Sequence, residues 1–189
     1  MSRVTSIEEL SNLKSKIETE RKFTKQVLIC GGTGCISSGS NEIADKMTEK
    51  VKAAGKENEI RVIKTGCFGF CEKGPIVKML PDNTFYTEVT PEDADRLVET
   101  HLLKEEKIEE LLFVDPVTKN KISDSDHMDF YKKQERVALR NCGVIDPENI
   151  EDYLLYDGYT ALDKVLKMSQ QEVVDIMKDS GLRGRGGGG

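Results

Sequence analysis

The sequence CGGTGC at residues 30–35 and the sequence CFGFC at residues 67–71 decide the fold, because they carry four of the five cysteines of the chain in two tight pairs. Thiolates held at such short spacing suit a metal centre with tetrahedral coordination. The glycines around the cysteines let backbone N–H groups approach the sulfur atoms. The four cysteines of this predicted centre are Cys30, Cys35, Cys67 and Cys71.

The stretch between the two pairs predicts how the sulfur atoms meet. Residues 26–30 (QVLIC) read as a short buried strand, and residues 59–65 (EIRVIKT) alternate like a second strand. Between them, Ser40 is an expected N-cap for an amphipathic helix that Gly55 ends. A helical crossover joins parallel strands, whose carboxyl ends lie at one edge of a sheet. We therefore expect both cysteine pairs at the same edge, on loops.

The sequence on either side of this unit completes an α/β pattern. Ser6 and Glu9 form a capping box, which predicts a helix before the first strand. Residues 76–80 and 84–89 predict a β-hairpin, and the Thr90-Pro91 pair begins a further helix. The expected order is α-β-α-β-β-β-α.

This order, with these cysteines, resembles the thioredoxin-like [2Fe-2S] ferredoxin domain over about residues 6–103. The resemblance implies that Cys30 and Cys35 hold one iron of a [2Fe-2S] cluster, and that Cys67 and Cys71 hold the other. The nearby Lys64 and Lys73 would raise the reduction potential of such a cluster.

Two other interpretations of the quartet remain open. Structural zinc also takes four thiolates, and two disulfides are possible but are disfavoured in a reducing compartment. The fifth cysteine, Cys142, is expected to be a buried free thiol without a role in the centre. Neither histidine, His101 or His127, is assigned a role, and His101 is expected at a helix end where a cation favours the dipole.

Residues 104–128 are rich in charge, and we interpret them as a linker with one short strand at residues 111–114. The tract SDSDHMD, residues 123–129, is expected to be an exposed loop.

The part that follows is predicted to be mostly helical. Residues 130–141 are expected to form one helix, and Asp146-Pro147 to cap a second that Gly158 ends. Residues 160–168 predict a third helix, and Ser169 with Glu172 forms a capping box for a fourth.

The chain ends in SGLRGRGGGG, residues 180–189. A Rossmann fingerprint must follow a strand, whereas this run follows a predicted helix, so we reject that reading. The arginines and glycines would suit a phosphate or a flat ring lying against the backbone.

Three segments resemble the start of the complex I flavoprotein subunit and its soluble relatives: ALRNCGVIDPENIEDYL, GYTALDKVL and SGLRGRGGGG. The resemblance implies that the glycine run, which opens the family motif, contacts FMN and NAD(P)(H). The residues concerned are Gly184, Arg185, Gly186, Gly187, Gly188 and Gly189. It also implies that the chain is the N-terminal part of a longer subunit, with the [4Fe-4S] cysteines farther on.

The composition bears on partners and location. The net charge is −6 without a basic run, which argues against nucleic acid. No apolar stretch approaches the roughly 20 residues that span a membrane, and the N-terminus lacks a signal-peptide core, so we expect a cytoplasmic protein.

The fold class predicted is therefore an α/β thioredoxin-like [2Fe-2S] domain in residues 1–103, a linker in residues 104–128, and a mainly helical segment in residues 129–189. That last segment would open a complex I flavoprotein-type FMN/NAD domain. The resemblance implies an electron-transfer subunit of an NAD(P)-dependent oxidoreductase or hydrogenase complex, a class that includes electron-bifurcating complexes. Such a subunit would be active only together with other iron–sulfur subunits. The alternative is a zinc-stabilised interaction module without redox chemistry.

Overall fold

The core of the molecule is a mixed four-stranded sheet with the strand order β2-β1-β3-β4. The computed structural model describes residue 4, residues 6–184 and residue 186. Strand β1, Lys25–Cys30, runs parallel to β2, Ile60–Thr65, and antiparallel to β3, Val77–Leu80. Strand β4, Thr84–Tyr86, pairs with β3 as the predicted hairpin.

The register of β1 and β2 confirms the predicted parallel pair. Lys25 lies opposite Ile60, and Cys30 at the end of β1 lies opposite Thr65 at the end of β2. Both strands therefore end at one edge of the sheet, where the two cysteine pairs follow.

The crossover between β1 and β2 contains two helices where one was expected. Helix α2, Thr33–Ser37, includes Cys35, so the first cysteine pair is not held on a loop alone. Helix α3, Ser40–Ala53, has Gly39 as its N-cap, with a φ of 94° that favours glycine, and Ser40 is its first residue rather than its cap. Gly55, with a φ of 64°, follows the end of α3 as predicted.

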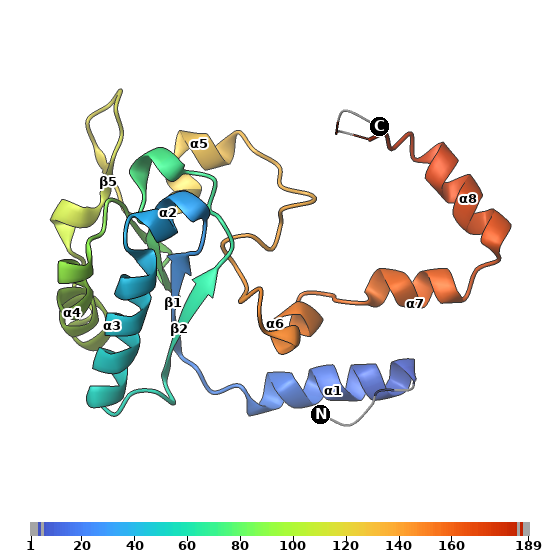
Figure 1. The fold of residues 1–189 in the computed structure, drawn as a ribbon, viewed down its shortest axis with the longest axis horizontal. Coiled ribbons are helices and arrows are strands. Elements are labelled where there is room, and N and C mark those ends of the chain that lie inside the picture. Colours follow the sequence, from blue (N-terminus) through green and yellow to red (C-terminus); the bar gives the residue numbers. More distant parts are fainter. Residues whose placement is uncertain (1–3, 5, 185, 187–189) are drawn as a thin grey trace.

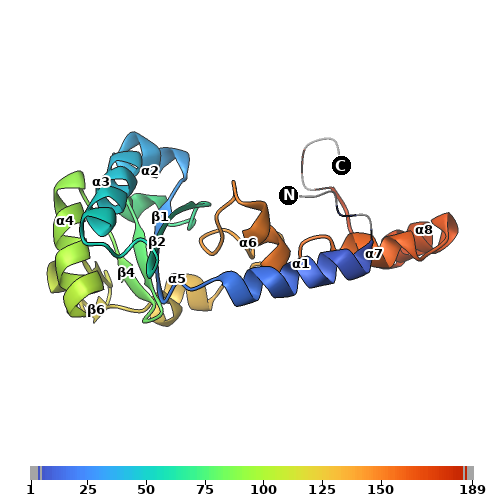
Figure 2. The same cartoon turned by 90° about the horizontal axis from the view of Figure 1, so that it is seen from below.

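The sheet is covered on both faces. On one face, alternate side chains of β1 and β3 pack against α3 and the helical segment that follows β4. On the other face, Leu28 and Cys30 pack with Phe68, Phe85 and Met128. Figure 2 shows α2 and α3 on one side of the strands and α5 on the other. The buried first cysteine pair therefore belongs to the second, aromatic-rich cluster.

The helical segment after β4 begins at the expected residue. Thr90 and Asp93 form a capping box at the 3-10 turn Pro91–Asp93, which continues through α4, Ala94–Arg96, into the π-helical turn Leu97–Leu102. Its buried face consists of Ala94, Leu97, Val98, His101 and Leu102.

Residues 104–128 lie along the outer edge of β4. The amide of Phe85 donates to the carbonyl of Ser123 at 2.7 Å, and that of Thr87 to the carbonyl of Leu111 at 2.9 Å. The segment includes a small hairpin of β5, Phe113–Val114, and β6, Lys121–Ile122. The predicted strand is thus present but shorter. The division into residues 1–103, 104–128 and 129–189 stays a prediction, and these contacts tie much of the middle segment to the sheet.

The tract at residues 123–129 is not the exposed loop that was expected. Ser125 is 5% exposed and Met128 is 1% exposed, and Met128 joins the aromatic face of the sheet. Most residues of this tract are polar, but its apolar residue Met128 is buried against the sheet.

The C-terminal part is helical, but its first helix is short. Helix α5 covers Asp129–Lys132 and not the predicted residues 130–141, because the chain turns at Lys133 to bring Arg136 against Phe68. Helix α6, Ile150–Leu155, is capped by Asn149 and not by Asp146. Helices α7, Thr160–Leu166, and α8, Gln170–Asp179, follow, and the capping box of Ser169 and Glu172 is confirmed.

A buried carboxylate fixes α6 to the rest of the molecule. Asp152, with 3% of its side chain exposed, pairs with Arg61 of β2 at 2.8 Å and with Arg21, which follows α1, Ile7–Glu20. Its other oxygen accepts the amide of Asp146 at 2.8 Å. These contacts hold the turn before α6 beside β2.

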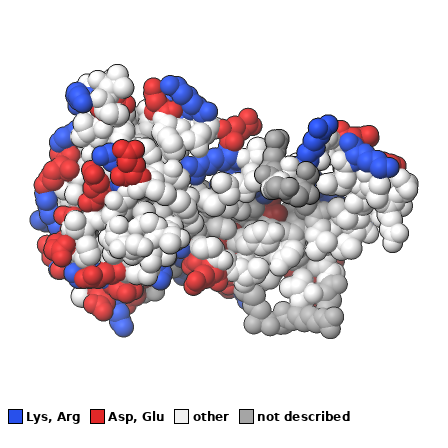
Figure 3. Space-filling model, turned by 45° about the horizontal axis from the view of Figure 1, so that its top comes forward, with Lys and Arg blue, Asp and Glu red and all other residues white. Residues whose placement is uncertain are grey.

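Helices α7 and α8 extend away from the sheet (Figure 1) and keep many apolar side chains exposed. Leu166 is 72% exposed, and Ile176 and Met177 are each 52% exposed. Figure 3 shows acidic and basic side chains interspersed over the α/β body on the face that it presents. Within the described part of the chain, no helix has the length and apolarity that crossing a membrane requires.

Candidate metal centre

The first cysteine pair is buried at the end of β1. Cys30 is 1% exposed and Cys35 is 2% exposed, and the thiol of Cys35 is hydrogen-bonded to that of Cys30. The backbone of Ile76 lies near this thiol and acts to lower the pKa of Cys35, against the effect of burial. A Cβ atom added to Gly74 would lie 2.5 Å from Cys35 Sγ, so only glycine fits at that position.

The second pair is nearer the surface, after the end of β2. Cys67 is half-buried and Cys71 is exposed, and their sulfur atoms lie 3.9 Å apart. Gly69, with a φ of 80°, turns the loop so that its amide donates to Cys67 Sγ at 3.2 Å. Glycine is required here because a side chain at this φ is strained.

The two pairs meet at Gly32. A Cβ atom on Gly32 would lie 3.0 Å from Cys67 Sγ and 3.5 Å from Cys30 Sγ, so sulfur atoms of both pairs flank one glycine. The structure thus brings together the four cysteines that the sequence singled out, at the edge of the sheet that the parallel strands predict.

The donor set suits tetrahedral metal coordination. Two sulfur atoms bound at about 2.3 Å to one tetrahedral ion lie about 3.8 Å apart, close to the separation in the second pair. Within the described residues, no three Cys, His, Asp or Glu side chains lie close enough together to hold one metal ion. Four thiolates arranged as two pairs suit a [2Fe-2S] cluster, in which two irons share the four cysteines.

Two thiols of the quartet, those of Cys35 and Cys71, have a raised pKa and so resist ionisation. Burial raises the pKa of Cys35 to about 12, with further contributions from its hydrogen bond to Cys30 and from the charges of Cys30 and Cys71. The hydrogen bond and the charge of Cys67 raise the pKa of Cys71. A bound cation must therefore displace protons from these two thiols.

Residues 129–145, called here the covering segment, lie against the second cysteine loop. Tyr131 Oη donates to the carbonyl of Phe68 at 3.1 Å, and Arg136 Nη2 donates to the same carbonyl at 2.5 Å. The hydroxyl of Thr65 donates to the carbonyl of Ile145 at 2.6 Å. Sequence reasoning missed these residues, because they are distant in sequence and stand in a stretch that reads as an ordinary helix.

The lysines that the sequence placed near the centre are engaged elsewhere. Lys64 Nζ lies 3.5 Å from the amide oxygen of Asn41, and Lys73 Nζ lies 3.4 Å from a carboxylate oxygen of Glu88. Arg136 is a cation that contacts the backbone of the second loop.

Cys142 lies beside the centre but outside the quartet. It is half-buried and not fully buried as expected, and a Cβ atom on Gly66 would lie 3.3 Å from its sulfur. The next residue, Gly143, has a φ of 78° and packs on the ring of Phe68.

His101 lies in the last turn of its helical segment, as expected, but it is buried and not free in solvent. It is 7% exposed, its Nδ1 lies 2.6 Å from Tyr86 Oη, and its Nε2 lies 3.4 Å from Asp82 Oδ2. Burial lowers the pKa of His101, although the carboxylate of Asp82 opposes this effect. This network lies at the end of the sheet opposite the cysteines, since Asp82 is in the turn that follows the pairing of Leu80 with Gln26.

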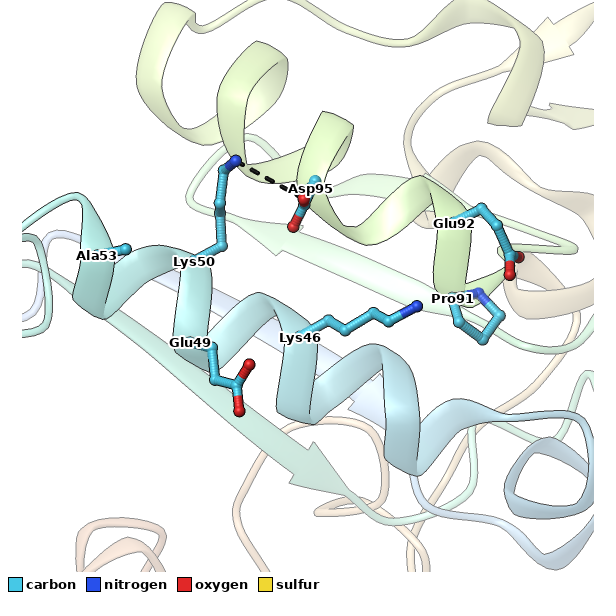
Figure 4. Close-up of a pocket in the computed structure, with 7 residues that line it drawn as sticks. All are labelled: Lys46, Glu49, Lys50, Ala53, Pro91, Glu92 and Asp95. Carbon is cyan, nitrogen blue, oxygen red and sulfur yellow. Dashed lines mark ion pairs between the residues drawn. The ribbon is translucent and has the colours of Figure 1, made fainter.

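A cavity of about 550 Å³ lies between α3 and the helical segment that follows β4 (Figure 4). Its lining is charged, and Lys50 pairs with Asp95 across it at 3.7 Å. None of the five cysteines lines it, so it is separate from the candidate centre.

The glycine run lies only partly within the described residues. Gly184 and Gly186 are described and are exposed, whereas Arg185, Gly187, Gly188 and Gly189 lie outside the described residues. A Cβ atom on Gly186 would meet no described neighbour within 4 Å. The predicted role of this run in cofactor binding stays a prediction.

Residues 3–102 match the family model of the thioredoxin-like [2Fe-2S] ferredoxins. The chain belongs to this family. It is 36% identical over 77 residues to the "Ferredoxin, 2Fe-2S" of Clostridium pasteurianum, a match that covers 41% of this chain and 76% of the relative. The family and this relative support a [2Fe-2S] cluster and an electron-transfer domain.

Two longer relatives match shorter stretches. The chain is 64% identical over 58 residues to the "NADP-reducing hydrogenase subunit HndC" of Solidesulfovibrio fructosivorans, covering 31% of this chain and 12% of that protein. It is 62% identical over 34 residues to an NADH-quinone oxidoreductase subunit of Mycobacterium tuberculosis, covering 18% of this chain and 8% of that protein. The chain therefore spans only a small part of either relative's length.

Among solved structures, the thioredoxin-like [2Fe-2S] ferredoxin from Aquifex aeolicus is 31% identical, with a TM-score of 0.45. The match covers 49% of this chain and 99% of the ferredoxin.

Proposed function

We propose that this chain carries single electrons through a [2Fe-2S] cluster held by the cysteine quartet. Cys30 and Cys35 bind one iron, and Cys67 and Cys71 bind the other. The observation that carries the proposal is the meeting of two sulfur pairs at one edge of the sheet, around Gly32.

Three features of the protein suit this site to a cluster: hydrogen bonding to sulfur, the burial of the first cysteine pair and the exposure of Cys71. A [2Fe-2S] cluster supplies a one-electron carrier at a potential that its surroundings set. The amide of Gly69 donates to Cys67 Sγ and so stabilises negative charge on this thiolate. The burial of Cys30 and Cys35 excludes water from one side of the site, while the exposed Cys71 gives the shortest route to the surface.

The proposal extends to a larger oxidoreductase. We infer that the chain serves as an electron-transfer part of an NAD(P)(H)-linked complex of the hydrogenase or NADH dehydrogenase type, with other iron–sulfur subunits as partners. The names of the two longer relatives support this inference. An FMN in the complete subunit would exchange hydride with NAD(P)(H) and single electrons with the cluster, with or without electron bifurcation. A cytoplasmic location is part of the proposal.

The glycine run at residues 184–189 is proposed to open the FMN and nicotinamide site. Glycines permit the close approach that a flat ring or a pyrophosphate needs, and Arg185 would supply positive charge. The exposed apolar side chains of α7 and α8 support packing of these helices against a further part of such a subunit.

Metal analysis tests the cluster. The anaerobically purified chain should contain about two irons and two acid-labile sulfides and should absorb visible light. Stoichiometric zinc without sulfide would favour the alternative, a zinc-stabilised interaction module, and would refute the redox proposal.

A separate experiment tests the flavin site. The protein tested is a subunit that contains this chain and is as long as HndC. FMN and NADH are titrated against this subunit and against its Gly186→Val variant. The valine side chain should block cofactor binding without removing the visible spectrum of the cluster. Unchanged binding of both cofactors would show that the run does not form the site.

Limited proteolysis tests the division at residues 104–128. A first cut within this segment that releases a coloured N-terminal piece supports a linker. A first cut beyond residue 128 would show that the segment belongs with the sheet that it contacts.

A further inference from the structure

The second cysteine loop is bound by a part of the chain that lies outside the matched ferredoxin residues 3–102. Within the covering segment, Tyr131 and Arg136 both donate to the carbonyl of Phe68, the residue after Cys67. One carbonyl thus accepts two side-chain donors from the same segment, which fixes both donors relative to the loop.

The guanidinium of Arg136 lies against the backbone of this loop, beside the residue whose amide donates to Cys67 Sγ. A Cβ atom on Gly69 would lie 3.1 Å from Arg136 Nη2, and the amide of Gly69 donates to Cys67 Sγ at 3.2 Å. The guanidinium carbon also lies 5.1 Å from the centroid of the Tyr131 ring, so the ring holds the cation from another side. The ring of Tyr131 is in turn packed against Phe85, at a centroid distance of 5.8 Å.

The charge of Arg136 is not neutralised within the described part of the chain. Its side chain forms no ion pair with any described carboxylate, whereas the nearby Lys73 pairs with Glu88 and Lys133 pairs with Asp129. A positive charge without an acidic partner, half-buried beside thiolates, acts on them with less screening than a fully exposed one.

We propose that Arg136 is a positioning and charge-compensating residue that raises the reduction potential of the [2Fe-2S] cluster. This inference rests on the proposed function. Reduction adds one electron, and hence one negative charge, to the cluster, and no bond forms or breaks in the protein. The guanidinium stabilises the more negative state more strongly, and so it favours reduction.

The covering segment therefore links the electron affinity of the cluster to the helices that follow it in the chain. Thr65 and Gly66, at the start of the loop, contact Ile145 and Cys142 of the same segment. A change that moved the segment would withdraw Arg136 and lower the potential without altering any ligand of the cluster.

The test is a redox titration of the full chain, purified anaerobically, with dithionite as the reductant and the electron paramagnetic resonance signal of the reduced cluster as the readout. Arg136→Gln removes the charge, and Arg136→Lys keeps it. Arg140→Gln is the matched control, because Arg140 is an exposed arginine of the same segment without a hydrogen bond or ion pair among the described residues. Iron and sulfide contents are measured for each protein.

We expect Arg136→Gln to lower the ratio of reduced to oxidised cluster about tenfold at a fixed applied potential, which for one electron corresponds to about 59 mV. Arg140→Gln should change this ratio less than about twofold, because bulk water screens an exposed charge. Arg136→Lys should recover most of the ratio.

Three results would overturn the inference, and they are distinct from failure of the proposed function. Equal potentials for Arg136→Gln and Arg140→Gln, both with full clusters, would show that the charge of Arg136 has no effect. Arg136→Lys titrating like Arg136→Gln would show that packing rather than charge is responsible. Loss of the cluster in both Arg136 variants, but not in Arg140→Gln, would make Arg136 a structural support of the loop. Absence of iron and sulfide from the parent chain would instead refute the proposed function.

Discussion

Replacing Asp152 by Asn should loosen the turn that packs beside the second cysteine loop. The carboxylate is almost completely buried and receives hydrogen bonds from Arg61, Arg21 and the amide of Asp146. Although burial alone would raise it, these contacts hold the pKa of Asp152 below its ordinary value. The side chain is therefore ionised at neutral pH. Removing its charge leaves two arginines without their shared partner.

The size of the effect follows from burial. Breaking a buried ion pair by removing one partner costs about 3–5 kcal/mol. The side chains of Arg61 and Arg21 remain 14% and 23% exposed, so water can solvate them in part and the lower end, about 3 kcal/mol, applies. That free energy corresponds to roughly a hundredfold increase in the population of locally opened α6.

Hydrogen exchange followed by mass spectrometry measures this opening. Amides of α6, Ile150–Leu155, should lose about two orders of magnitude of protection in Asp152→Asn, while those of α3 should not change. The control is Asp157→Asn, which removes the surface pair with Lys14 at 3.2 Å and should cost at most about 1 kcal/mol. Equal protection of α6 in both variants would refute the argument that the buried carboxylate anchors this helix.

Three further outcomes are expected. Cys142→Ser should retain the visible spectrum and the iron content, because this thiol lies outside the quartet, and loss of colour in a folded variant would show a wrong ligand set. Gly143→Ala should destabilise the fold by about 1–3 kcal/mol in urea unfolding. The φ of Gly143 is 78°, and an added Cβ would lie 2.7 Å from the ring of Phe68. A variant as stable as the wild type would contradict this prediction. The free energy of unfolding should fall as the pH drops below about 6.5, because burial lowers the pKa of His101 and the unfolded chain then binds more protons than the folded one. His101→Gln should reduce this slope, and an unchanged slope would exclude His101 as its source.

The geometry of the candidate centre could be predicted from the sequence because short-range rules decide it. The buried run before Cys30 and the alternating run before Cys67 each predict a strand, and the helix between them requires the strands to be parallel. The parallel arrangement alone then places both cysteine pairs at one edge. Even the error at Ser40 is local, since the glycine before it takes the left-handed conformation and becomes the cap.

The surroundings of the centre could not be predicted in this way, because they depend on contacts between distant residues. Residues 130–141 have the composition of a helix, yet the helix ends at Lys132. Beyond this point the helical hydrogen bonds stop, and Tyr131 and Arg136 contact the carbonyl of Phe68. No periodicity in the sequence reveals that Phe68 offers its carbonyl to that segment. For the same reason the sequence indicates Lys64 and Lys73 as cations near the centre and gives no signal for Arg136.

The two halves of the quartet differ in a way that gives the proposed electron path a direction. Cys30 and Cys35 are enclosed by the sheet and by Gly74, whereas Cys71 is exposed. An electron leaving the buried side would have to cross the core, so in the proposed function exchange with a partner would be faster through the side of Cys67 and Cys71. The covering segment contacts that same side through Phe68. The residues that enclose the centre in the free chain therefore also border the surface where a redox partner would approach, and a partner that shifts them would change both access to the cluster and its charge environment.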